Sequence, residues 1–273
     1  MPEAPDLKVI VDFLNKRAKG LAVDSARVVK PSVVRPLAGD VGKDIPGRTL
    51  DGFERRGKFV LVSLSGGRML AINPMLTGLF QWCSSADKPF KRTCLVLALS
   101  DGHDLRYLDD KQMGMVYYCR PEQVAVIPKF KDGVPDVLDD IPYAEFKQRL
   151  RPFRGEIKGV LTRGDFVTGI GNAYADELLF EARIYPFKKS TRLSGEELRR
   201  LHGAMKPVME WAIAEPERRV GEEIHEKIRD FLKVHDKGGQ PCPRCGNPIS
   251  ELTANQRITS YCRRCQPGLL IRN

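Results

Sequence analysis

Hydrophobic residues recur at helical spacing near the start of the chain. Four of them occupy positions i, i+3, i+4 and i+7, namely Leu7, Ile10, Val11 and Leu14. A proline begins this stretch and a glycine ends it, which is the usual order at the two ends of a helix. The spacing places the four side chains on one face and predicts an amphipathic helix over residues 5–20.

Short apolar runs separated by glycine turns follow in the first half of the chain. The runs 58–64 and 68–72 flank Ser-Gly-Gly, and the runs 94–100 and 104–108 flank a turn that contains Asp-Gly. Runs of this length joined through glycine are typical of β-hairpins. We therefore predict two hairpins and a mostly antiparallel first half.

The pattern changes at residues 132–142, which are rich in proline, aspartate and glycine and favour a linker. Helical spacing dominates beyond them. Ser194 and Glu197 have the spacing of a capping box and mark the start of the longest stretch. The predicted helices are 143–150, 173–182, 194–215 and 221–234.

The composition is that of a globular protein, with 42% hydrophobic and 29% charged residues in a chain of 273. We expect no membrane partner, because no apolar run approaches the roughly 20 residues that a spanning helix needs. The acidic, proline-containing N-terminus differs from a secretory signal, so we expect a cytoplasmic protein without disulfides. A net charge of +10 favours a polyanionic partner without identifying it.

Four cysteines near the C-terminus form two matched pairs. Residues 246–261 separate one Cys-x-x-Cys from the other, a spacing that fits a four-thiolate structural Zn²⁺ site. A disulfide pair and a redox motif are the alternatives, and the expected compartment and the matched pairs argue against them. The predicted ligands of one zinc ion are Cys242, Cys245, Cys262 and Cys265.

Two further segments suit a phosphate, although each has an ordinary explanation as well. Residues 255–259 resemble the turn of a hairpin, from which Arg257 is either a phosphate ligand or a plain surface arginine. Gly169 and Gly171 precede a predicted helix whose N-terminus suits an anion, yet taken alone they are better explained by an ordinary tight turn. Asn172 is also a common type of helix N-cap.

Taken together, these residues resemble the Fpg/Nei family of DNA glycosylases. The matching motifs are Met1-Pro2-Glu3 with Pro5, Arg56-Gly57-Lys58-Phe59, Gly169-Ile170-Gly171-Asn172 with the following Ala-Tyr-Ala-Asp-Glu, and the cysteine pairs. They occur in family order over nearly the whole chain. The resemblance implies an α+β protein with an N-terminal catalytic β-sandwich domain (1–133), a helix–two-turn–helix DNA-binding domain (134–237) and a zinc finger (238–273).

The resemblance also implies an activity and a partner. Family members excise oxidised bases from double-stranded DNA and then cut the strand at the abasic site. We accordingly expect a monomer that binds damaged duplex DNA, associates with the nucleoid, and uses one structural Zn²⁺ with no other cofactor.

The catalytic residues implied by the resemblance are Pro2, Glu3 and Lys58. Removal of Met1 leaves Pro2 with a free secondary amine, whose pKa near 7.7–8.0 makes it a usable nucleophile. Glu3 corresponds to the acid/base carboxylate, and Lys58 to a lysine that contacts the phosphate and the sugar.

The implied DNA contacts lie further along the chain. Asn172 and Arg257 correspond to the residues that grip phosphates beside the lesion, and Lys158 to a lysine near the base and backbone. The residues that fill the gap left by the extruded base are Leu76, Lys111 and Met113, where much of the family has Met, Arg and Phe. Lysine lacks the forked donor of arginine, which puts recognition of the opposite base in doubt.

The preferred lesion is open. Asp6 stands where a glutamate is usual, and residues 216–234 have a helical pattern without the glycine- and proline-rich loop of the purine-specific branch. This pattern favours oxidised pyrimidines, ring-opened bases or abasic sites over 8-oxoguanine.

Two rival functions are a damage-binding protein without excision and a zinc-ribbon protein of RNA metabolism.

Overall fold

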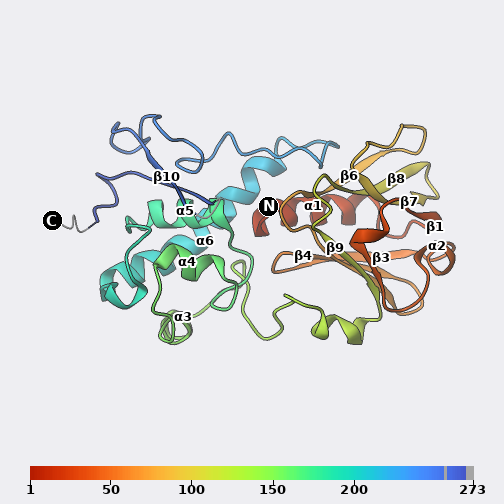
Figure 1. The fold of residues 1–273 in the computed structure, drawn as a ribbon, viewed down its shortest axis with the longest axis horizontal. Coiled ribbons are helices and arrows are strands. Elements are labelled where there is room, and N and C mark those ends of the chain that lie inside the picture. The colour runs from red at the N-terminus through yellow and green to blue at the C-terminus, as the bar shows by residue number, and fades with distance from the viewer. Residues whose placement is uncertain (255–256, 269–273) are drawn as a thin grey trace. The chain divides into compact units, whose positions relative to one another are not determined.

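The structure is a computed structural model that describes residues 1–254 and 257–268. The chain divides into two compact units, one formed by residues 1–132 with 213–228 and the other by residues 133–212 with 229–268 (Figure 1). The first break, between residues 132 and 133, falls at the start of the predicted linker, whereas the return of residues 213–228 to the first unit has no counterpart in the predicted domains. The zinc segment belongs to the same unit as most of the helical part.

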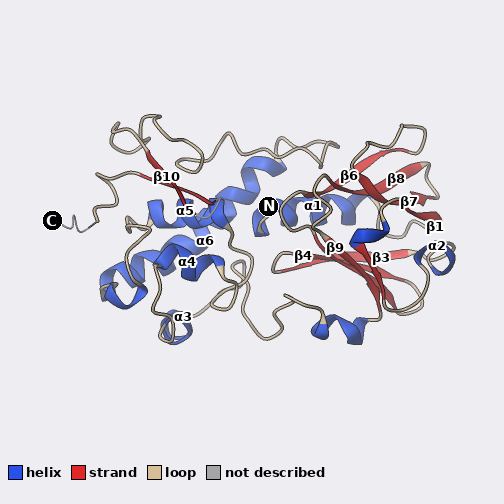
Figure 2. Cartoon of the chain, in the orientation of Figure 1, coloured by secondary structure: helices blue, strands red, loops and turns tan. Residues whose placement is uncertain are grey.

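The strands of the first unit form two sheets (Figure 2). A four-stranded sheet has the order β1-β7-β8-β6, and a five-stranded sheet has the order β2-β9-β5-β4-β3. All neighbours are antiparallel except β2 and β9. The strands are β1 Val23–Val28, β2 Val34–Pro36, β3 Leu50–Arg56, β4 Phe59–Leu64, β5 Arg68–Asn73, β6 Gly78–Ser84, β7 Thr93–Leu99, β8 His103–Asp109 and β9 Met115–Cys119.

One hydrophobic core joins both sheets and helix α1 (Ala4–Arg17). Leu7 and Leu14 of the helix are fully buried with Val60 and Leu70 of one sheet and Leu97 of the other. The α+β prediction, with its N-terminal β-sandwich, is confirmed. Short helical elements in this unit are α2 Val41–Asp44, η1 Pro31–Val33 and η2 Pro121–Val126.

The second unit contains helices and one hairpin. Its elements are α3 Tyr143–Leu150, α4 Ile157–Thr162, α5 Asn172–Glu181, η3 Ser190–Arg192, most of α6 (Gly195–Glu217), β10 Ser250–Ala254 and β11 Arg257–Tyr261. The predicted capping box is present, because Ser194 N–H donates to Glu197 and Glu197 N–H donates to the Ser194 hydroxyl. Residues 255–256 of the predicted turn lie outside the described residues.

The predicted helix at 221–234 is wrong, because this segment is irregular. A helix would bury its apolar face in one core. Instead, Ile224 is buried in the core of the first unit and Val234 beside the cysteines of the second. The helical pattern therefore no longer supports a preference for oxidised pyrimidines. Among the described residues, none of the helices is long and apolar enough to cross a membrane.

Candidate functional site

Pro2 and Glu3 are both buried and stand directly before α1. Glu3 is the N-cap residue, and its N–H donates to the carboxylate of Asp6 over 2.7 Å. The bond belongs to a capping box, which sets the angle at which the chain enters a helix. Asp6, the residue that replaces the usual glutamate, thus helps to hold the backbone that carries Pro2.

A narrow cavity lies beside Pro2 within the first unit. Asp6, Ile10 and Leu79 line it together with Ile224 and Lys227 from the segment after α6. Its volume of about 30 Å³ accommodates roughly two water molecules. A nucleobase needs considerably more room, so it does not fit this cavity in its present form.

Lys58 is half-buried in the tight turn between β3 and β4. Gly57 precedes it with φ of 57°, a backbone conformation that glycine adopts without strain. The guanidinium of Arg55 donates to the carbonyl of Gly57 over 2.7 Å. The turn is closed by the pairing of Arg56 with Phe59, so Lys58 stands at a defined position one residue before β4.

The three predicted gap-filling residues are exposed in two loops of the first unit. Leu76 lies between β5 and β6, and its exposed fraction is 44%. Lys111 and Met113 lie between β8 and β9, and Met113 is 41% exposed.

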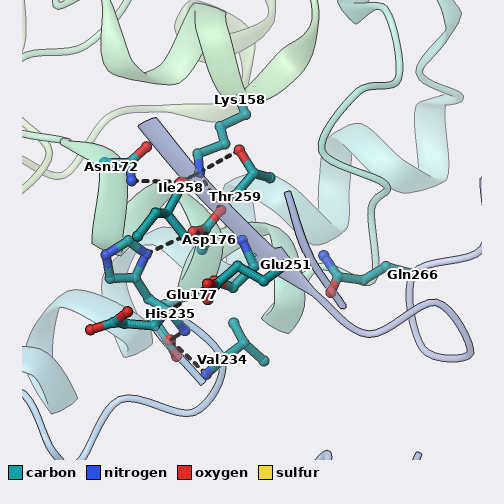
Figure 3. A network of polar contacts seen from close by, with 12 residues as sticks. Lys158, Asn172, Asp176, Glu177, Val234, His235, Glu251, Ile258, Thr259 and Gln266 are labelled. Atoms are coloured by element: carbon teal, nitrogen blue, oxygen red, sulfur yellow. Dashed lines mark hydrogen bonds and ion pairs between the residues drawn. The ribbon is translucent and has the colours of Figure 1, made fainter. Parts of the chain in front are cut away.

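Asn172 and Arg257, the two predicted phosphate ligands, are brought together in the second unit. Asn172 is the first residue of α5, and its Nδ2 donates to the carbonyl of Ile258 over 2.7 Å (Figure 3). Arg257 is the residue before Ile258, at the exposed start of β11. The asparagine therefore fixes the hairpin beside the helix N-terminus, where N–H groups and the helix dipole favour an anion.

Lys158 is only 7% exposed and is held inside the second unit. Its Nζ donates to the carbonyl of Ile258 over 2.8 Å and to the hydroxyl of Thr259 over 3.0 Å. It also pairs with the carboxylate of Asp176 at 2.7 Å (Figure 3). The ammonium group thus joins α4 and α5 to the strand that begins with Arg257.

Asp176 and Glu177 attach the rest of the zinc segment to α5. Asp176 is fully buried, and its other oxygen accepts hydrogen bonds from His235 Nδ1 over 2.8 Å and Ser260 N–H over 3.2 Å. Glu177 accepts from the N–H groups of residues 233, 234 and 235. Burial raises the pKa of Glu177 above its ordinary value, although the three N–H donors oppose this shift.

The four predicted zinc ligands form one cluster. All their Sγ atoms lie within 4.8 Å of one another, with 3.9 Å between Cys242 and Cys265 and 3.5 Å between Cys245 and Cys262. Tetrahedral zinc with Zn–S bonds of about 2.3 Å places sulfur atoms about 3.8 Å apart. The cluster therefore fits a single zinc ion.

The chemistry of these donors also calls for a cation. Burial, and after it the neighbouring sulfurs, raises the pKa of the Cys265 thiol to about 12, whereas a hydrogen bond from the backbone of Asn247 lowers the pKa of the Cys245 thiol to about 7. Four thiols this close cannot all ionise unless a positive charge compensates them. Around them, Arg244 donates to the Phe180 carbonyl over 2.8 Å and lies over the Phe180 ring at 4.2 Å, which ties the first cysteine pair to α5.

Sequence reasoning missed several residues that hold the site, chief among them Asp176, Glu177 and His235. The available signal was a pair of adjacent acidic residues in a predicted helix whose neighbouring residues are mostly apolar, because carboxylates buried among apolar side chains require partners. Apart from Lys158, which pairs with Asp176, the partners of the two carboxylates lie 56 to 84 residues away, beyond the reach of local pattern.

Comparison with family models and known proteins identifies the class of this fold and site. Residues 1–116 match the formamidopyrimidine-DNA glycosylase N-terminal domain, residues 133–223 match the formamidopyrimidine-DNA glycosylase H2TH domain, and residues 239–268 match a zinc finger found in FPG and IleRS. A formamidopyrimidine-DNA glycosylase of Pelotomaculum thermopropionicum is 31% identical, with 97% of this chain and 99% of the relative covered. One of Desulforamulus reducens is 35% identical at the same coverage. The chain belongs to the formamidopyrimidine-DNA glycosylase family.

Solved structures also match this chain over nearly its whole length. A Lactococcus lactis Fpg in complex with DNA containing N7-benzyl-Fapy-dG matches with a TM-score of 0.88 and 26% identity, over 98% of this chain and all of that one. A Lactococcus lactis Fpg complex with DNA containing an abasic site matches with a TM-score of 0.86 and 25% identity, over 97% of this chain and all of that one.

Proposed function

We propose that this protein is a base-excision repair enzyme that removes damaged bases from DNA and then cuts the strand at the abasic site. The observation that carries the proposal is family membership over nearly the whole chain, combined with Pro2 and Glu3 at the start of α1. Its substrate is damaged double-stranded DNA.

Pro2 is the proposed nucleophile after removal of Met1. Its amine nitrogen attacks C1′ of the deoxyribose, and the bond between C1′ and the base breaks as the base takes up a proton. Opening of the sugar leaves an iminium ion between the nitrogen and C1′. This electron sink acidifies the C2′ proton, whose loss expels the 3′ phosphate, and a second elimination expels the 5′ phosphate.

Glu3 and Lys58 are the proposed partners of the amine. Glu3 is adjacent to Pro2 in the chain, and its carboxylate moves protons between the amine, the sugar oxygen and the departing base. Lys58 supplies positive charge to the phosphate and the sugar from its turn before β4. The N-cap position of Glu3 and the closed turn at Lys58 limit the freedom of both backbones, which supports a preorganised site.

Two sets of residues are proposed to bind the DNA. Asn172 and Arg257 grip phosphates next to the lesion, which is supported by their joint position at the N-terminus of α5. Leu76 and Met113 enter the duplex as apolar wedges, with Lys111 beside the opposite base. We assign Lys158 a supporting role in this grip, because its ammonium group already holds the strand that carries Arg257.

Zinc takes no part in the proposed chemistry. A bound zinc ion would be enclosed by a shell of four thiolates, which would hold the hairpin together and leave no coordination position for water or substrate. Cys242, Cys245, Cys262 and Cys265 are its ligands, and Arg257 is the functional residue that this shell positions.

A panel of single-lesion duplexes tests the proposal. It contains a formamidopyrimidine, 8-oxoguanine, an oxidised pyrimidine and an abasic site, with undamaged duplex and single-stranded RNA as controls. The expected result is multiple-turnover cutting at the abasic site and excision of at least one damaged base. Tight binding to damaged duplex without cutting would instead favour a damage-binding protein, and equal binding to RNA would favour the zinc-ribbon alternative.

Among the damaged bases of this panel, we expect the formamidopyrimidine to be excised fastest. It is the lesion in the name of the relatives and in the DNA of a matching complex. The preference between purine and pyrimidine lesions depends on how residues 216–228 open the cavity beside Pro2. Comparison of kcat/KM across the panel measures that preference directly.

A further inference from the structure

The two exposed apolar tips of the first unit share an unusual backbone feature. Leu76 follows Met75, whose φ is 48°, and Met113 follows Gln112, whose φ is 50°. Residues with a side chain rarely adopt this left-handed conformation, so the surroundings must hold it. Strain of this kind, repeated directly before both tips, indicates that their positions are set by other contacts.

Asp109 makes those contacts at the base of both loops. Its side chain is 1% exposed, and one oxygen accepts hydrogen bonds from the Thr77 hydroxyl and, over 3.2 Å, from the N–H of Lys111. The other oxygen accepts from the N–H of Gly114 over 2.7 Å. Thr77 belongs to the loop of Leu76, whereas residues 111 and 114 flank Met113. One buried carboxylate therefore joins the two loops.

Close packing beneath the loops supports the same connection. A Cβ atom on Gly78 would lie 2.3 Å from the hydroxyl of Tyr107, and one on Gly114 would lie 1.8 Å from it. Both loop ends thus rest against one buried tyrosine, and neither tolerates a side chain. At the tip of the second loop, the hydroxyl of Ser32 donates to the side chain of Gln112 over 2.6 Å.

We propose that Asp109 is a positioning residue for base extrusion. By fixing the loops of Leu76 and Met113 as one body, its carboxylate makes the two side chains enter the duplex together. A wedge that is rigid before binding loses little conformational entropy on insertion, so more of its contact energy opens the base pair. This inference rests on the proposed wedge role of the two tips.

Thr77→Val and Asp109→Asn test the connection, and Thr77→Ser is the rescue variant that keeps the hydroxyl. Base extrusion is monitored through the fluorescence of 2-aminopurine placed next to a formamidopyrimidine lesion in duplex DNA. Excision of the lesion is measured under single-turnover conditions. Cutting of a single-stranded oligonucleotide with an abasic site needs no base pair to be opened and serves as the reference reaction.

We expect Thr77→Val and Asp109→Asn to slow extrusion and duplex excision by about tenfold, because each removes a buried hydrogen bond to a charged group. Cutting of the single strand should change by less than about twofold, and Thr77→Ser should restore duplex excision. Asp101→Asn, in the turn at the other end of β8, is the matched control and should leave all rates unchanged.

Leu76→Ala and Met113→Ala separate this inference from the wedge role itself. If neither slows extrusion, the wedge role fails and the inference falls with it. If both slow extrusion while Thr77→Val and Asp109→Asn do not, only the positioning role of Asp109 is overturned. Equal slowing on duplex and single strand would also overturn it, because general damage to the fold, visible as a lowered Tm, then explains the loss.

Discussion

Replacing Lys158 with methionine perturbs the contact that joins the strand of Arg257 to its helix. Methionine keeps much of the length and apolar character of the stem but removes the ammonium group. The buried Asp176 then loses its ion-pair partner, while Ile258 and Thr259 lose a donor. The consequence should be local, because these partners all lie in α5 and β11.

The size of the effect follows from burial. Breaking a buried ion pair from one side typically costs about 3–5 kcal/mol. Asp176 keeps its bonds to His235 and to the N–H of Ser260, so we expect the lower end, about 3 kcal/mol. A loss of stability of this size raises the equilibrium population of the locally open state by roughly a hundredfold.

Amide hydrogen exchange of the zinc-loaded protein without DNA measures this opening. Peptides that cover residues 172–181 and 257–261 should exchange about a hundredfold faster in Lys158→Met, and peptides from residues 1–132 should be unchanged. Arg257→Gln is the control, since this exposed side chain should change local stability by less than about 0.5 kcal/mol while weakening DNA binding.

Unchanged exchange in Lys158→Met would refute this reasoning. Lys158 would then serve mainly as a direct DNA contact, as the family resemblance suggested. Its loss would be expected to make the negative slope of log K against log salt shallower by about 0.9 without any loss of stability.

Further predictions concern the zinc cluster and the five-stranded sheet. Cys262→Ser should lower zinc content and DNA affinity together while leaving the first unit folded, as measured by metal analysis and hydrogen exchange; full excision without bound metal would contradict the structural role. A hydrogen bond from Tyr118, aided by Arg48, lowers the pKa of Asp44 from 3.8 to about 2. The resulting stabilisation is complete above pH 4 and disappears as the pH falls through about 2. Tyr118→Phe should therefore lower the free energy of unfolding above pH 4. As the pH falls from 4 to about 2, its free energy of unfolding should converge with that of the parent, as urea unfolding at a series of pH values would show.

Local chemistry made much of the fold predictable. The apolar spacing from Leu7 to Leu14 and the glycine turns each determine an element through residues that are neighbours in sequence. The capping box at Ser194 also acts over three residues. The cysteine spacing was informative for the same reason, because each pair provides two thiolates from one short turn.

Contacts over long sequence distances account for what could not be predicted. Residues 221–234 have a helical pattern, but Ile224 and Val234 are buried in different units, which prevents a single helix. The partners of Lys158 lie up to 101 residues away, so its burial became visible only with the fold. The same holds for Asp109, whose carboxylate reaches Thr77 from the neighbouring strand end.

Trapping with borohydride tests the central claim, that the amine of Pro2 forms the covalent bond to DNA. The protein is incubated with duplex DNA containing an abasic site, reduced, digested and sequenced by mass spectrometry. We predict a stable adduct on the N-terminal peptide at Pro2. In Pro2→Gly, whose primary amine replaces the secondary amine of proline, we predict a lower yield of adduct and slower strand cutting. An adduct on another residue, or trapping and cutting by Pro2→Gly that equal the parent, would contradict the assignment.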